Sequence, residues 1–217
     1  MVSKNSLEVS KTVITKRNFR YLEFWGRDPD FILHPTEHIN PHIDIYRFPP
    51  KKVKWFFQKS PIYNQYVYMS AGMSDADMPV KTAVDIIPSR IELTAFSNEI
   101  YKNQSGDMDM IAWWLSFLAH LPFRSGNTFF APGHTFTTKE AIIPDSKMTG
   151  FFFGVTPSVD LKNLCSASIN AKLILQVVPI SDSERKLAEQ KGSNCLVDYF
   201  EKHNIEPMFD LRREPFI

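Results

Sequence analysis

Cysteine is scarce in this chain of 217 residues, which holds only Cys165 and Cys195. Two isolated thiols cannot form the disulfide framework of a small secreted domain, and they fit a reducing compartment better than an oxidising one. The first six residues also lack the apolar stretch of a secretory signal. The sequence therefore predicts a cytoplasmic protein.

An excess of one charge and a long hydrophobic run are also missing. The chain has 25 Lys and Arg against 24 Asp and Glu, a formal net charge of +1. Proteins that bind nucleic acids or anionic membranes through their net field usually carry a basic excess. The longest apolar stretch, residues 111–121, is too short to span a bilayer. We therefore expect neither nucleic acid nor membrane as a partner.

Glycine is sparse too, because the eight glycines are scattered and form no loop that could cradle a phosphate. We expect no cofactor and no small-molecule substrate. The chain is instead rich in large apolar side chains, with 43% hydrophobic residues, 18 Phe and 4 Trp. This composition predicts one well-filled domain over residues 14–217, preceded by a polar, flexible N-terminus over residues 1–13.

The hydrophobic pattern predicts strands interspersed with helices, and hence an α+β domain. One helix, over residues 108–121, is apolar on nearly every face, so we expect it to be buried with Trp113 and Trp114 in the core. Asp107 could accept hydrogen bonds from its first turn, and Pro122 should end it. The other expected helices cover residues 17–25, 181–191 and 196–204, and the expected strands cover 42–48, 63–69, 90–96, 128–130, 151–155 and 173–178.

The turn Gly72-Met73-Ser74-Asp75-Ala76 resembles a nucleophile elbow, but its fifth residue is Ala76 where that motif needs glycine. A hydrolase would have to combine Ser74 with an acid such as Asp85 and with His134, and nothing in the spacing favours this. The residue types favour a tight turn in which Ser74 and Asp75 bond the local backbone. We therefore predict no catalytic residue.

Three histidines, His34, His38 and His42, recur every fourth residue, the spacing of a metal-binding helix face. Pro35 and Pro41 make a helix there implausible, so the sequence predicts no metal site. Segment 51–59 interleaves lysines with aromatic residues, as single-strand nucleic-acid platforms do. With a net charge near zero, we expect a short amphipathic element instead.

A set of segments in a fixed order resembles the suppressor-of-fused domain family and extends from about Phe24 to Phe216. The most specific match is the loop after the apolar helix, and the other matches precede and follow it in the order of the family. The segments are Phe24-Trp25-Gly26-Arg27-Asp28-Pro29, Tyr68-Met69-Ser70-Ala71-Gly72-Met73-Ser74-Asp75, Asp77-Met78-Pro79, Ile91-Glu92-Leu93-Thr94, Ser125-Gly126-Asn127-Thr128-Phe129 with Gly133-His134, Leu175-Gln176-Val177-Val178 and Asp210-Leu211-Arg212-Arg213.

The resemblance implies a mixed, largely antiparallel sheet flanked by helices in a single domain, which binds a protein without catalysis or cofactor. Animal members bind zinc-finger transcription factors, but Leu121 and Gly133 stand where those members carry a tyrosine and an acid facing the partner. Single-domain bacterial members are similar to immunity proteins that neutralise a cognate polymorphic toxin. There are two alternatives. The chain could regulate another intracellular partner by binding it, or it could be a hydrolase that uses Ser74 and His134.

The predicted partner-binding residues lie on and near the loop that carries the resemblance. The segment follows a rigid helix and combines an arginine, an amide and an aromatic residue, which are common in interfaces. The same residues could instead only shape a turn around a core phenylalanine. Because the chain is nearly neutral, binding of a basic toxin would need a local acidic patch. Asp75, Asp77 and Asp85 are the candidates for such a patch. The predicted site consists of Arg124, Ser125, Asn127, Phe129, His134 and Asp75.

Overall fold

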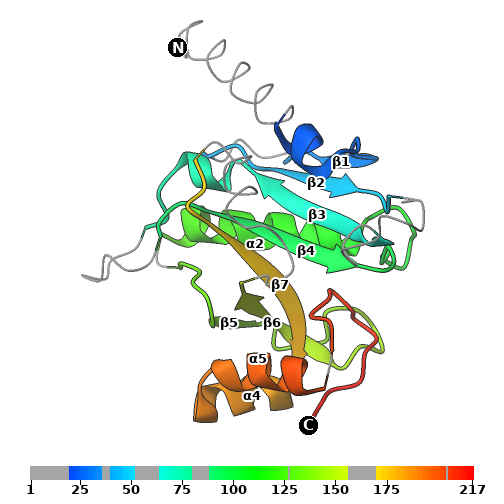
Figure 1. The fold of residues 1–217 in the computed structure, drawn as a ribbon, viewed down its shortest axis with the longest axis vertical. Coiled ribbons are helices and arrows are strands. Elements are labelled where there is room, and N and C mark those ends of the chain that lie inside the picture. The colour runs from blue at the N-terminus through cyan, green and yellow to red at the C-terminus, as the bar shows by residue number, and fades with distance from the viewer. Residues whose placement is uncertain are drawn as a thin grey trace, which may run out of the picture.

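The computed structural model describes residues 20–35, 40–51, 64–79, 88–126, 128–155, 170–203 and 205–217. Its strands form a seven-stranded sheet in the order β1-β2-β3-β4-β7-β6-β5. Strands β4 and β7 pair in parallel and the other neighbours pair antiparallel, so the predicted mixed, largely antiparallel sheet is confirmed (Figure 1). The strands are β1 (Phe31–Leu33), β2 (Asp44–Phe48), β3 (Tyr66–Ala71), β4 (Ile91–Ser97), β5 (Thr135–Thr137), β6 (Met148–Gly154) and β7 (Leu173–Ser181).

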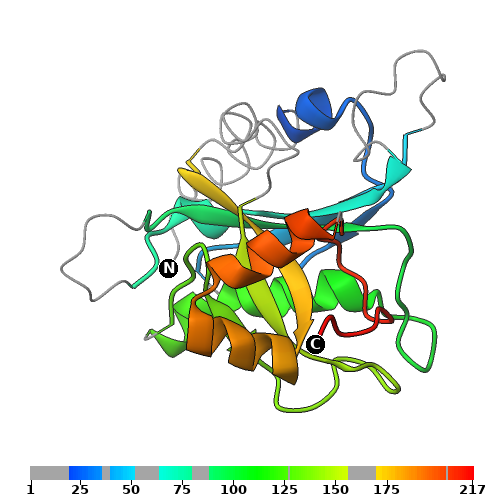
Figure 2. The ribbon, with the colours of Figure 1, turned by 60° about the horizontal axis from the view of Figure 1, so that its bottom comes forward.

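Helices cover both faces of this sheet (Figures 1 and 2). Helix α2 (Met110–Ser125) packs on one face, while a short helix over residues 20–25 and the pair α4 (Asp182–Lys191) and α5 (Asn194–Lys202) pack on the other. The alternation of β7 shows this division, because Leu175 and Val177 join the cluster around α2, whereas Ile174 and Val178 join the two clusters opposite. The arrangement confirms an α+β fold.

Strand β7 is buried on both faces, as its continuous apolar run predicts. Helix α4 begins with the predicted capping box, in which the Ser181 hydroxyl accepts from the amide of Glu184 and the Glu184 side chain accepts from the amide of Ser181. Two short strands depart from the prediction. Residues 128–130 form no strand, and β5 lies further along the chain at the edge of the sheet.

The boundaries of α2 differ from the predicted ones at both ends. Asp109, not Asp107, caps its start by accepting from the amides of Ile111 and Ala112. Pro122 does not end the helix, because it lies in the last turn, where its missing N–H removes one hydrogen bond and the remaining turn still closes. The helix ends at Gly126, which has a φ of 63° and donates to the Pro122 carbonyl.

The cap of α2 is also its anchor to the sheet. The buried Asp109 carboxylate accepts from Arg47 Nη1 at 2.7 Å and from the Tyr68 hydroxyl at 2.9 Å. Burial and this carboxylate together raise the pKa of Tyr68 above its ordinary value, so the hydroxyl remains a donor. Strands β2 and β3 therefore hold the start of α2 in a fixed position.

The prediction that α2 is buried on nearly all faces holds for most of its residues up to Leu121 but is wrong for Trp113. Trp113 is 39% exposed, and its neighbour Trp114 is only partly buried against the core. Consecutive helix residues point about 100° apart, so both indoles cannot face the sheet. On the side away from its contact with the sheet, Trp113 and Arg124 are exposed, whereas His120, which lies between them on the same face, is buried. Among the described residues, no helix is both long and apolar enough to cross a membrane.

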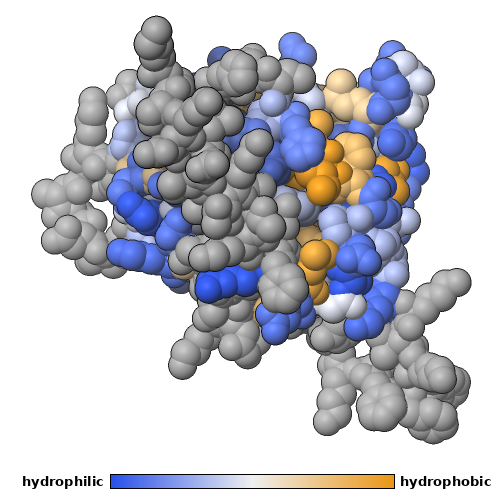
Figure 3. All heavy atoms as spheres, turned by 90° about the horizontal axis from the view of Figure 1, so that it is seen from above, coloured by the Kyte–Doolittle hydropathy of each residue, from blue (hydrophilic) through white to orange (hydrophobic). Residues whose placement is uncertain are grey.

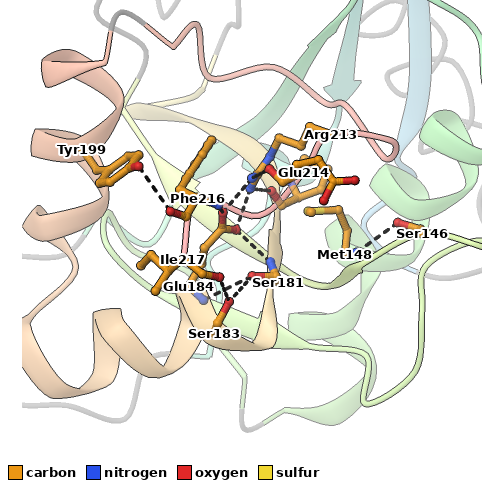
Figure 4. A network of polar contacts seen from close by, with 11 residues as sticks. Ser146, Met148, Ser181, Ser183, Glu184, Tyr199, Arg213, Glu214, Phe216 and Ile217 are labelled. Carbon is orange, nitrogen blue, oxygen red and sulfur yellow. Dashed lines mark hydrogen bonds and ion pairs between the residues drawn. The ribbon is translucent and has the colours of Figure 1, made fainter.

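The C-terminal segment returns to the domain and is held by a polar network around Glu184 (Figure 4). The fully buried Glu184 carboxylate accepts from both Nη atoms of Arg213, each at 2.7 Å, and from the amide of Phe216 at 2.9 Å. Burial, the largest influence, opposes ionisation, but the Arg213 hydrogen bonds and charge prevail and lower the pKa of Glu184. The network fastens the end of the chain to α4.

Candidate functional site

One face of α2 carries aromatic and basic side chains, of which Trp113 and Arg124 are exposed and His120 is buried. Residues 113, 117 and 124 are separated by four and seven positions, so they lie on one face and span about 17 Å along the helix. The Trp113 and Phe117 rings stack with centroids 5.9 Å apart and an interplanar angle of 11°. The ring of Phe136, on β5, lies 6.3 Å from that of Phe117. We call Trp113, Phe117, Phe136 and Arg124 the α2 aromatic face.

The α2 aromatic face has the composition of a protein-binding surface. Trp113 and Arg124 are exposed, and Phe117 and Phe136 are partly buried beside them. Tryptophan and arginine are, with tyrosine, the residues most enriched among interface hot spots. The helix is fixed by its cap and by the sheet, so docking on this face would order few further groups.

The predicted loop after α2 is built mainly from local contacts. Ser125 is the last residue of the helix, and its hydroxyl donates to Thr128 Oγ1 at 2.8 Å. Phe129 packs partly buried against the main core, and the His134 ring lies edge-on to it at 5.1 Å. The structure thus brings Phe129 and His134 together and places Arg124 and Ser125 just before them. Asn127 lies outside the described residues.

The predicted acidic residues lie on a different element. Asp75 is exposed on the short 3-10 helix η3 (Met73–Asp75) and accepts from the Asn170 amide at 3.0 Å. Hydrogen bonds from Arg90 and Ser89 lower the pKa of Asp77 to about 2. The charge of Asp77 is therefore partly compensated by Arg90, and Asp85 lies outside the described residues.

The geometry of Ser74 opposes a role as a nucleophile. Its buried hydroxyl donates to Glu92 Oε1 at 2.6 Å, and the amides of Gly72 and Ser74 donate to the same oxygen at 3.1 Å each. A serine nucleophile needs an accessible hydroxyl and a base that takes its proton. His134 belongs to the loop before β5, with its ring against Phe129. The predicted turn is therefore closed on a buried glutamate side chain, not only on local backbone.

Two of the three histidines that recur every fourth residue come together, although not on a helix. His34 and His42 both contact the side chain of Asp44. His38 lies outside the described residues, as does the basic and aromatic segment 51–59 apart from Lys51.

A pocket of about 410 Å³ opens on the opposite face of the sheet from α2, between β6, β7 and α5. Its apolar lining includes Phe152, Val178 and Phe200, and Glu201 and Glu206 lie at its border. These residues are dispersed over the chain and form no motif, so sequence reasoning could not find the pocket. It is a second surface on which a partner could bind.

Comparison with known proteins identifies the family. The model of the family "Suppressor of fused protein (SUFU)" matches residues 40–214, which is most of the chain. The chain belongs to the SUFU family. A SUFU homologue from Neisseria gonorrhoeae has the same fold, with a TM-score of 0.62 and 15% identity over 94% of this chain and 96% of that one.

A second solved SUFU structure, titled as the complex of Sufu with Fu, gives a TM-score of 0.54 and 12% identity over 85% of this chain and 82% of that one. At such identities the two structures support the fold alone. No curated protein sequence matches the chain. The family match includes all of α2, β5 and the loop between them, so the α2 aromatic face is part of the SUFU domain itself.

Sequence reasoning predicted a binding role for Arg124 but missed the aromatic residues on the same helix face and the neighbouring strand. It assigned Trp113 to the core, and it predicted no strand that would carry Phe136. The overlooked signal was the pair Trp113-Trp114. Adjacent side chains on a helix point about 100° apart, so the two indoles cannot both point into the core. Residues 113 and 117 also share the face of Arg124, and this spacing could have linked them to the predicted site.

Proposed function

We propose that this chain is a non-catalytic, cytoplasmic protein-binding domain that acts as an immunity protein by neutralising a cognate toxin domain. Membership of the SUFU family supports protein binding, since one solved relative is in complex with another protein. The Neisseria homologue, which the chain covers almost completely, supports a bacterial setting for a SUFU domain of this length. Single-domain bacterial members resemble immunity proteins.

The observation that carries the proposal is the α2 aromatic face. A stacked tryptophan that is 39% exposed on a rigid helix loses water-exposed apolar area when a partner covers it. Arg124, at the end of the same face, offers five donors to carboxylates or carbonyls of the partner. We include the sequence-predicted residues Ser125, Asn127, Phe129 and His134 in the proposed binding site, with Asp75 as a peripheral contact.

The charge of the chain restricts the kind of partner. With 25 basic and 24 acidic residues, long-range attraction to a strongly basic toxin would be weak. We therefore expect the toxin surface to be mainly apolar and hydrogen-bonding, and the affinity to change little with salt. A toxin that binds nucleic acid would have to be recognised away from its basic cleft.

Co-expression in a bacterial host tests the proposal. The chain is produced together with a toxin domain taken from a neighbouring reading frame, where one is found, and growth is measured with wild-type protein and with the variants Trp113→Ala and Arg124→Ala. We expect wild-type protein to restore growth, and each variant to weaken the purified complex by at least about 1–2 kcal/mol while costing no more than about 1 kcal/mol of stability. Failure of the wild-type protein to protect or bind would refute the immunity role.

A matched control distinguishes the two surfaces. Val197 is exposed on α5 and lines the pocket on the opposite face of the sheet. Val197→Ala also removes exposed apolar atoms, so it should leave protection and affinity unchanged if the partner covers α2. If Val197→Ala abolishes binding and Trp113→Ala does not, the partner occupies the pocket and the proposed surface is wrong.

A further inference from the structure

Two histidines and one aspartate meet where β1 joins β2. His34 follows directly on β1, and the antiparallel register that pairs Leu33 with Ile45 puts it across from Asp44. His42 lies two residues before Asp44, so the alternation of an extended chain can direct both side chains to one side. His34 Nδ1 and His42 Nε2 each lie 2.9 Å from Asp44 Oδ1, and the three potential ligand atoms lie within 4.8 Å of one another.

We propose that these three residues bind a divalent transition metal ion, with Zn²⁺ as the best fit. Two imidazole nitrogens and one carboxylate oxygen form a ligand set typical of zinc, whereas Mg²⁺ and Ca²⁺ prefer sites made of oxygen atoms. Three protein ligands leave a fourth tetrahedral position for water or for a side chain of another protein. The site is separate from the α2 aromatic face and does not depend on the proposed function.

The burial of the three residues suits this role. The Asp44 side chain is 3% exposed, whereas those of His34 and His42 are 66% and 46% exposed. Both rings contact the Asp44 side chain, His34 through a hydrogen bond and His42 at an ion-pair distance. A buried carboxylate carries a desolvation cost that a bound cation would offset. Asp44 is thus a fixed anchor, and the two rings can move toward an ion.

The two histidine–aspartate distances need only a small adjustment. With zinc–ligand bonds of about 2.0–2.1 Å at tetrahedral angles, neighbouring ligand atoms lie about 3.3 Å apart. The two nitrogen–oxygen distances of 2.9 Å would therefore widen by about 0.4 Å, which exposed rings can accommodate. In the metal complex, each neutral ring carries its proton on the nitrogen that does not face Asp44. The ion would hold the end of β1, an edge strand, onto β2.

Calorimetric titration of tag-free, metal-stripped protein with ZnCl₂ tests the site. We expect one ion per chain, and at least a tenfold loss of affinity in each of the variants His34→Ala and His42→Ala. Asp44→Asn should weaken binding similarly, because it keeps the size of the side chain and removes the charge. The control is His203→Ala. His203 is exposed, follows α5 and stacks on Tyr199, so it does not belong to the proposed metal site. It should bind Zn²⁺ like the wild type.

Binding of Co²⁺ provides a second readout, because a tetrahedral cobalt site gives a strong visible absorption that His34→Ala and His42→Ala should abolish. If Asp44→Asn unfolds, the two histidine variants still decide, since they change exposed rings and their folding is checked by circular dichroism. The proposal is overturned if the wild type binds no Zn²⁺, or if His34→Ala and His42→Ala bind it with wild-type affinity. It is also overturned if His203→Ala loses as much affinity as they do.

Discussion

Replacing Arg213 by alanine should lower the free energy of unfolding by about 3–5 kcal/mol, the usual cost of leaving one member of a buried ion pair without its partner. Arg213 donates to both oxygens of Glu184 and to the Pro179 carbonyl, each at 2.7 Å. Its side chain is 12% exposed and that of Glu184 is fully buried. The variant keeps the buried carboxylate and removes its counter-charge.

The neighbouring residue provides a matched control. Arg212 pairs with Glu99 at 3.4 Å, but its side chain is 71% exposed. Exposed pairs contribute about 0–1 kcal/mol, because water screens the charges and the side chains lose entropy on pairing. Arg212→Ala should therefore change stability by less than about 1 kcal/mol, although it removes the same side chain from the adjacent position.

The assay is urea denaturation monitored by tryptophan fluorescence, performed from neutral to acid pH. Because the folded-state pKa of Glu184 is lowered, its stabilising contribution is complete above its ordinary pKa of 4.5 and is lost as the pH falls through the folded-state value. The difference between wild type and Arg213→Ala should therefore shrink in acid. An Arg213→Ala cost no larger than that of Arg212→Ala at neutral pH would refute the reasoning.

Three further outcomes follow from the described contacts. Trp114→Ala should cost about 3 kcal/mol, since its ring packs 5.2 Å from that of Phe151, whereas Trp113→Ala should cost no more than about 1 kcal/mol in chemical denaturation. Ser74→Ala should cost about 1–3 kcal/mol by removing a donor to a buried carboxyl group, and a fluorophosphonate probe should label neither protein. Gly133→Ala should lower the melting temperature, because the residue has a φ of 86° and an added Cβ would lie 2.3 Å from Ser193 Oγ; an unchanged value would contradict this.

The features of the fold that depend on residues close together in the chain could be predicted from the sequence. The capping box at Ser181 and the apolar run of β7 each depend on residues close together in the chain, and both are confirmed. The edge strands β1 and β5 could not be predicted, because each has three residues and exists through pairing with a distant strand. The parallel pairing of β4 with β7 is likewise a long-range property.

The same assumption hid both candidate sites from sequence reasoning. It was that the sequence pattern within a single helix or strand is enough to show which of its residues are buried or meet at a site. The composition of α2 shows that most of its residues are apolar, but burial depends on which sides of the helix other elements cover. Trp113 is exposed because the sheet covers one side and the helices 20–25, α4 and α5 pack on the opposite face of the sheet.

The spacing of four between the histidines is typical of a metal-binding helix. Because Pro35 and Pro41 exclude a helix there, the sequence predicts no metal site. Strand pairing restores the contact by another route. An antiparallel neighbour brings His34 to Asp44, and a spacing of two brings His42 to the same carboxylate. A His-x-Asp pair at the start of a predicted strand, with another histidine ten residues before the aspartate, is therefore the pattern to test in a sequence with no metal-binding helix.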